Sequence, residues 1–547
     1  MAGATPGSAA ALAARNRAAA RMSVLTLVSR GTGFVRVMVV AAVLGTSYLG
    51  NVYQSANMVP NILFELFAAG VLQSILVPVM VEAVDRSSHG EAEHTAGVVF
   101  GAILALLSAI VAAGMVAAPW LIRGLVSGVD DPGVREAQEQ LGLFLLWFFL
   151  PQVVFYAANL VATAVLNARG VFGLPVFAPT VNNVVMIGVY LLFAQLRGGR
   201  PPGLDLELDE KLVLGLGTTL GVVLFCLVPV VGLARSGFSL RPRFEPRHPV
   251  LRRLVRQGIW AAGFLAATQL LLVVVLLLAN GVEGGVVVYQ LAYVLFMLPH
   301  SLFAVPVFTT AFPALTRAAV AHQWEAFAEE VGRATRSIAA FTLLSAAAVV
   351  ALAQPLSQVI ALGNAAARTE DVAGAIAAFA LGLPGFSALL FLTRVAYSRS
   401  DTRTPTLVNL MVLVLGGVAM WVLSAAMDTG DRVVAIGLGY ALAHTVGAAT
   451  LGALLRRHLH DVGAEVRQVA LPVARILLGA VVATVVVRVL VSLVDPAGVG
   501  ASLATLAVGG PAAVVLAALT IRAVGGPGPL VLARTLGADP GRGGATR

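Results

Sequence analysis

The sequence predicts an all-α protein that crosses a membrane about fourteen times. Of its 547 residues, 59% are hydrophobic and only 12% are charged, and the mean hydropathy is +0.90. Soluble domains carry about 25% charged residues, so this composition excludes an ordinary soluble fold. Apolar runs recur along the whole length, and runs of about 18 residues or more are long enough to cross a bilayer.

The apolar runs divide the chain into a series of predicted membrane spans. The loops between them are short, and the longest, 235–253, is too small for a folded domain. The predicted spans are 24–46, 52–82, 96–124, 141–168, 174–198, 212–234, 254–280, 285–315, 334–363, 371–397, 405–427, 431–455, 467–494 and 498–523.

Basic residues predict the orientation of these spans. The net charge of +9 rests on arginine, because Lys211 is the only lysine. With the N-terminus inside, twenty-five of the 36 Lys and Arg residues fall in cytoplasmic segments and seven in external ones. Cytoplasmic loops of membrane proteins are rich in Lys and Arg. We therefore expect a multi-pass protein of the cytoplasmic membrane with both termini cytoplasmic, and no nucleic-acid partner.

Short strings recur six spans apart. VYQ occurs at 52–54 and again at 288–290, and PTVNN at 179–183 is matched by PTLVN at 405–409. An even spacing gives both copies the same orientation, which predicts a parallel repeat of two six-helix lobes. The predicted parts are a disordered cytoplasmic tail (1–21), the N-terminal lobe (22–234), a basic cytoplasmic loop (235–253), the C-terminal lobe (254–456), a further helix pair (467–524) and a cytoplasmic tail (525–547).

Two arginines stand inside the first predicted span. Arg30 lies nine residues beyond Arg21, or about 13 Å along a helix, which is too deep for easy snorkelling. Arg36 lies deeper still. An arginine inside a membrane costs about 2.5–3.5 kcal/mol on insertion scales, so it needs water, a partner or a ligand. Guanidinium groups match phosphate oxygens well, whereas Glu65 in the second span offers an ion-pair partner or an ion-coupling group.

Enzyme signatures are missing from the sequence. Lys211 follows Glu210, so no Walker A motif surrounds the only lysine, and neither an HExxH nor a GxSxG motif occurs. The single cysteine, Cys226, sits in an apolar run and is expected to be a packed core residue. We expect no catalytic residues, no cofactor and no metal; the HxH pair at 458–460 is a weak metal candidate.

The string SRGTGFVR at 29–36 resembles the S-R-x-x-G-F-x-R signature of the MurJ/MviN lipid II flippases. The stretches PN at 60–61, APT at 178–180 and YSRSDTRTP at 397–405 also resemble that family. The resemblance implies two rocking lobes that export lipid II, an undecaprenyl-diphosphate-linked peptidoglycan precursor, by alternating access. The implied partners are this lipid-linked diphosphate saccharide, membrane lipids and, as a further candidate, the cell-wall synthesis machinery.

Several positions depart from the family pattern. Residues that are acidic or basic in the family are replaced, at Val37, Asn51, Phe64, Glu65, Ala69 and Val294. Two alternatives therefore stay open: an ion-coupled exporter of another amphiphile that uses Glu65, or a non-transporting envelope paralogue. The candidate substrate-binding residues are Ser29, Arg30, Arg36, Asn51, Asn61 and Glu65.

Overall fold

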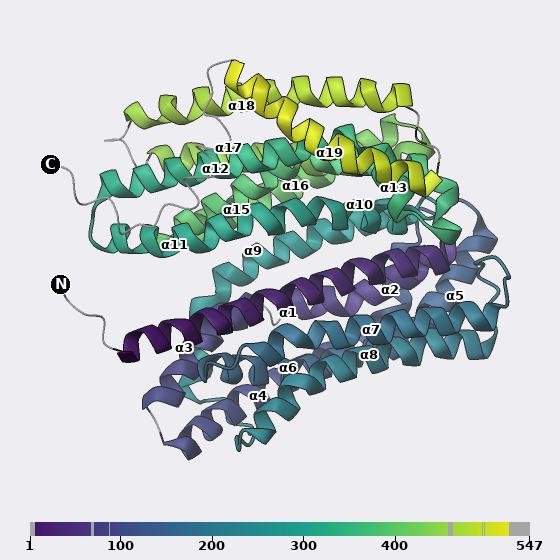
Figure 1. Ribbon diagram of the computed structural model, residues 1–547. Coiled ribbons are helices and arrows are strands. Elements are labelled where there is room, and N and C mark those ends of the chain that lie inside the picture. Colours follow the sequence, from purple (N-terminus) through teal and green to yellow (C-terminus); the bar gives the residue numbers. More distant parts are fainter. Residues whose placement is uncertain are drawn as a thin grey trace. The chain divides into compact units, whose positions relative to one another are not determined.

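A computed structural model describes residues 6–66, 70–86, 88–457, 463–494, 496 and 498–523. Every regular element in these ranges is a helix (Figure 1). Thirteen helical stretches among the described residues are long and apolar enough to cross a membrane, and the predicted all-α polytopic fold class is confirmed. The predicted span 52–82 is interrupted by residues 67–69, which lie outside the described ranges, as do residues 458–460 and the tail 525–547.

The chain divides into two compact units, Met1–Gln269 and Leu270–Arg547. The division falls inside α9 rather than in the loop 235–253. The helices of the N-terminal unit are α1 (Pro6–Leu44), α2 (Tyr48–Phe64), α3 (Gly70–Arg86), α4 (His89–Leu125), α5 (Pro132–Phe149), α6 (Gln152–Ala168), α7 (Gly173–Arg197), α8 (Leu208–Arg235) and the first part of α9 (Pro249–Asn280).

Helix α1 includes residues 6–21, which belong to the segment predicted as a disordered tail. It begins at Pro6 and continues without a break into the first span. The segment is rich in alanine, the strongest helix former, so its helical propensity outweighs its polar and charged residues.

The C-terminal unit contains the rest of α9 and all later helices. These are α10 (Gly285–Pro299), the π-helical turn η2 (His300–Ala304), α11 (Val305–Val320), α12 (Trp324–Ala351), α13 (Ala353–Ile360), α14 (Thr369–Leu381), α15 (Leu383–Ser398), α16 (Arg403–Ala426), α17 (Arg432–Arg457), α18 (Gly463–Val494) and α19 (Gly498–Ala523).

Prolines interrupt several predicted spans. Pro151 separates α5 from α6, Pro299 ends α10 before the π-helical turn, and Pro384 stands in the first turn of α15. Proline lacks a backbone N–H and clashes with the preceding turn, so it kinks or breaks a helix. Helices α2 and α7 continue through Pro60 and Pro179, whereas the three prolines above stand where one helix gives way to the next. Three predicted spans, 141–168, 285–315 and 371–397, therefore each contain two shorter α-helices in sequence.

The same helix packing occurs in both units. Helix α7 packs on α8 as α16 packs on α17, and α6 contacts α8 as α15 contacts α17. Helices α2 and α5 pair as α10 and α14 do. These pairs follow the six-span spacing of the sequence repeat.

A segment of residues 236–248, which we call the strap, connects α8 to α9 and lies on α4 in the N-terminal unit. The backbone N–H of Arg243 donates to the carbonyl of Gly97 at 2.9 Å. A Cβ at Gly101 would stand 2.1 Å from the carbonyl oxygen of Arg243. The absence of a side chain at Gly97 and Gly101 therefore permits this close approach.

A buried ion-pair network joins the facing ends of α7 and α8. The side chains of Arg197 and Glu210 are 5% and 1% exposed, and Nη1 of Arg197 lies 3.3 Å from Oε2 of Glu210. Arg200 reaches the other carboxylate oxygen at 2.8 Å. Glu210 also accepts the backbone N–H of Glu207 at 2.9 Å, which helps cap α8.

Candidate functional site

The N-terminal unit encloses a polar pocket of about 460 Å³. Five helices line it: α1, α2, α6, α7 and α8. Ligand pockets commonly measure about 300–1,000 Å³. The pocket is therefore large enough for part of a substrate.

Helix α2 contributes a polar stripe along one of its faces. Asn57, Asn61 and Glu65 follow one another at intervals of four residues, with Phe64 beside them. Side chains four residues apart lie on the same face of a helix. The backbone turns π-helical at Glu65 and Leu66, a feature found frequently at functional sites.

Helices α6, α7 and α8 complete the walls with the same helical periodicity. Each presents lining residues spaced three or four apart, so one face of each helix meets the pocket. Their polar or amphipathic members are Tyr156, Asn159 and Thr163 on α6, Asn182 and Asn183 on α7, and Thr218 on α8.

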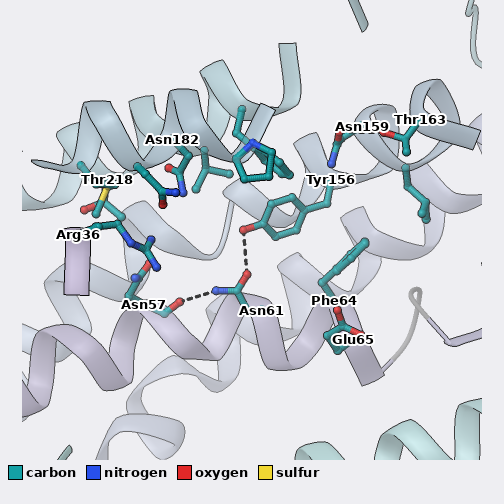
Figure 2. A pocket seen from close by; sticks show the side chains of 16 residues that line it. Arg36, Asn57, Asn61, Phe64, Glu65, Tyr156, Asn159, Thr163, Asn182 and Thr218 are labelled. Atoms are coloured by element: carbon teal, nitrogen blue, oxygen red, sulfur yellow. Dashed lines mark hydrogen bonds between the residues drawn. The ribbon is translucent and has the colours of Figure 1, made fainter. Parts of the chain in front are cut away.

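A hydrogen-bonded chain holds the α2 stripe in place (Figure 2). The hydroxyl of Tyr156 donates to Oδ1 of Asn61 at 3.1 Å, and Nδ2 of Asn61 donates to the carbonyl of Asn57 at 3.1 Å. The ring of Phe64 lies 4.9 Å from that of Tyr156, centroid to centroid. Both the oxygen and the nitrogen of the Asn61 amide therefore have hydrogen-bond partners, which fixes the orientation of the side chain.

The amides of Asn182 and Asn159 are held less tightly. Oδ1 of Asn182 is buried and accepts no hydrogen bond from the described residues. Asn159 is bonded only weakly, accepting from the Thr163 hydroxyl at 3.4 Å. A buried amide oxygen without a partner is costly, and this one faces Gly221 on α8, where an added Cβ would stand 2.7 Å from it.

Arg36 provides the positive charge of the pocket. It is partly buried and makes no ion pair with any carboxylate in the described ranges. The pairing of Arg36 with Glu65 that the sequence allowed is therefore not formed, although both residues line the pocket. The guanidinium is left available for an anionic ligand.

The predicted site residues divide into two groups. Arg36, Asn61 and Glu65 line the pocket, whereas Ser29, Arg30 and Asn51 are not among its lining residues. Asn51 is fully buried, and Arg30 is exposed on the surface. The carbonyl of Ser29 accepts a hydrogen bond from Nδ2 of Asn183 at 3.2 Å, which ties α1 to α7.

Some intramembrane amides serve helix packing instead. Nδ2 of Asn183 donates to Thr32 on α1 as well, and Nε2 of Gln152 donates to Thr219 on α8 at 2.9 Å. Interhelical bonds of this kind stabilise membrane helix bundles. They also fix the orientation of the helices that carry the pocket residues.

A family model described as "Lipid II flippase MurJ" matches residues 40–509 of the chain. The chain belongs to the MurJ lipid II flippase family. The lipid II flippase MurJ of Burkholderia cenocepacia is 27% identical over 436 residues, covering 78% of this chain and 81% of that protein. A probable lipid II flippase MurJ of Rhizobium tropici is 27% identical over 384 residues, covering 70% of each.

Solved structures show the same fold. A lipid II flippase MurJ in an inward closed conformation superimposes with a TM-score of 0.71 at 18% identity, covering 92% of this chain and 99% of that one. An inward-facing MATE family multidrug transporter of the MOP superfamily gives 0.63 at 14% identity, covering 80% and 96%. This MurJ family member is a multi-pass membrane transporter and not an enzyme.

Proposed function

We propose that this chain translocates lipid II, the lipid-linked peptidoglycan precursor, across the cytoplasmic membrane, and that the pocket of the N-terminal unit binds part of its head group. Family membership supports the substrate class. The pocket supplies polar contacts inside helices that are otherwise apolar. A hydrophilic head group needs such contacts to pass through a bilayer.

The observation that carries this proposal is the position of Arg36. Arg36 belongs to an apolar helix and lines the pocket. Its guanidinium has no carboxylate partner among the described residues. Keeping a charge there costs about 2.5–3.5 kcal/mol, which an anionic ligand offsets. A guanidinium binds phosphate through two parallel hydrogen bonds and stays charged in a poorly hydrated site.

The remaining predictions about transport are part of this proposal. Alternating access and a contact with the cell-wall synthesis machinery follow from the family resemblance. The lobes 22–234 and 254–456 follow from the sequence repeat. The arginine distribution supports a cytoplasmic location for both termini. Arg30, exposed outside the pocket, remains a candidate for a second contact with the diphosphate.

An ion-coupled exporter is the second candidate function, and Glu65 favours it. This carboxylate lines the pocket without an ion pair in the described part of the chain, and carboxylates inside membrane helices often carry coupling ions. Transport of an unrelated amphiphile that follows an imposed ion gradient, without transport of lipid II, would support it. A paralogue that transports nothing would give no flux with either substrate.

Reconstitution tests the proposal directly. The purified chain is placed in vesicles that contain fluorescent lipid II in both leaflets, and a membrane-impermeant quencher is added outside. We expect the inner-leaflet fluorescence to become quenchable much faster than in protein-free vesicles. Equal rates with and without the chain, for a protein that remains folded, would contradict the proposal.

A further inference from the structure

The pocket carries two charged side chains, and they have opposite signs. Arg36 and Glu65 are charged, and every other lining residue is neutral. The neutral polar members are mainly asparagines, which donate and accept hydrogen bonds. The lining therefore offers one site for an anion, one site for a cation, and amide groups.

The two charges stand apart rather than neutralising each other. Figure 2 shows Arg36 beside Asn57. Asn57 and Glu65 are eight residues apart in the sequence, which corresponds to about 12 Å along a helix. Figure 2 shows Arg36 and Glu65 on opposite sides of the view, with Asn61 between them. No ion pair joins Glu65 to any arginine within the described ranges.

A carboxylate in this position is stabilised by a positive partner. Glu65 is partly buried, and a charge withdrawn from water inside a membrane protein is costly unless it is paired. The next cationic lining residue is Arg36, at the other side of the pocket. A cationic group of the ligand would supply the missing partner while its anionic group binds Arg36.

We propose that the pocket recognises a zwitterionic head group, with a phosphate at Arg36 and a protonated amine at Glu65. Amide groups of the ligand would meet the asparagine side chains that line the pocket. The substrate class is thus a lipid-linked diphosphate whose peptide carries a free amine. This inference rests on the proposed function and adds a specificity-determining role for Glu65.

Two forms of the same substrate test this inference. One is lipid II with a free peptide amine, and the other is the same molecule after acetylation of that amine, which removes the charge. A hydrogen bond to a charged group contributes about 1.5–3 kcal/mol, so we expect the wild-type chain to move the free-amine form about 10- to 100-fold more efficiently. The measurement is the initial flipping rate against substrate density in reconstituted vesicles.

Variants of Glu65 assign the effect to this side chain. Glu65→Gln is expected to slow the free-amine substrate to the rate of the acetylated one, and to leave the acetylated one unchanged. Glu65→Asp keeps the charge and is expected to preserve the preference. Thermal unfolding in detergent confirms that both variants are folded.

Two results would overturn the inference, and each is distinguishable from failure of the proposed function. The wild-type chain moving both forms equally would exclude an amine site while leaving lipid II transport intact. Glu65→Gln slowing both forms equally would also exclude it, and a simultaneous loss of dependence on an ion gradient would assign Glu65 to coupling. No flipping of either form by the wild-type chain would instead contradict the proposed function.

Discussion

The hydroxyl of Tyr156 on α6 donates a hydrogen bond to Oδ1 of Asn61 on α2 at 3.1 Å (Figure 2). This bond connects two helices across the pocket and leaves Asn61 with one fixed amide orientation. The side chain of Asn61 is nevertheless exposed to the pocket. Its orientation is therefore set by the protein before any ligand arrives.

Replacing Tyr156 by Phe tests the role of this orientation. The variant keeps the ring that packs on Phe64 and loses the hydroxyl. The net value of such a hydrogen bond is about 0.5–1.5 kcal/mol, so we expect the apparent affinity for lipid II to fall by up to about tenfold. The maximal rate and the unfolding temperature should change little, and a large loss of stability would show that the hydroxyl is structural instead.

Thiol labelling tests which face of α2 meets the pocket. The single native cysteine, Cys226, is 2% exposed, and Cys226→Ala supplies a cysteine-free background. We expect Asn57→Cys to react with a water-soluble maleimide, and Asn51→Cys, at a fully buried position, to react far more slowly. Lipid II should protect Asn57→Cys, and equal labelling of the two cysteines would contradict the assigned pocket face.

The strap on α4 gives a prediction about stability. In Gly101→Ala the new Cβ meets the Arg243 carbonyl, and overpacking of this kind costs about 1–3 kcal/mol. We expect a lower unfolding temperature and faster proteolysis within residues 236–248. Gly124→Ala is the matched control on the same helix, because nothing lies within 4 Å of its Cβ position, and it should be neutral or slightly stabilising.

The ion-pair network between α7 and α8 gives a second stability prediction. Glu210→Gln leaves the guanidinium of Arg197 buried without its main partner, which costs about 3–5 kcal/mol in comparable cases. Glu329→Gln is the control, since its pair with Arg333 is exposed and such pairs contribute about 0–1 kcal/mol. Equal unfolding temperatures for the two variants would show that burial does not strengthen the network.

Much of the fold is predictable from the sequence because the bilayer imposes a simple rule. A helix that crosses it must be apolar over about 20 residues. The two helices 463–494 and 498–523 match the last two predicted spans closely. The breaks at Pro151 and Pro384 follow from proline chemistry. The helical start at Pro6 was missed because polar residues masked a strong alanine propensity.

The candidate site is predictable only in part. Arg36, Asn61 and Glu65 stand out because charged and amide side chains are rare in apolar spans. Asn57 was missed, although its spacing from Asn61 places both on one helix face. Sequence cannot show which polar residues meet a pocket and which bond a neighbouring helix, because that depends on how the helices pack.

The internal repeat shows the same limit. In the alignment of 52–54 with 288–290, Tyr293 takes the place of Asn57. Its ring lies among other aromatic rings, 5.6 Å from Phe296 and 6.5 Å from Tyr440. Matched positions of the repeat thus form a polar pocket in one unit and an aromatic core in the other.

The initial rate of lipid II flipping by Arg36→Gln in reconstituted vesicles tests the central claim most directly. A guanidinium bound to phosphate is worth about 1.5–3 kcal/mol, so the rate at low substrate density should fall by about 10- to 100-fold. Arg488→Gln, which removes an intramembrane arginine bonded to the carbonyl of Val350, should retain most activity. A folded Arg36→Gln variant that flips lipid II at the wild-type rate would contradict the claim that Arg36 binds the anionic head group.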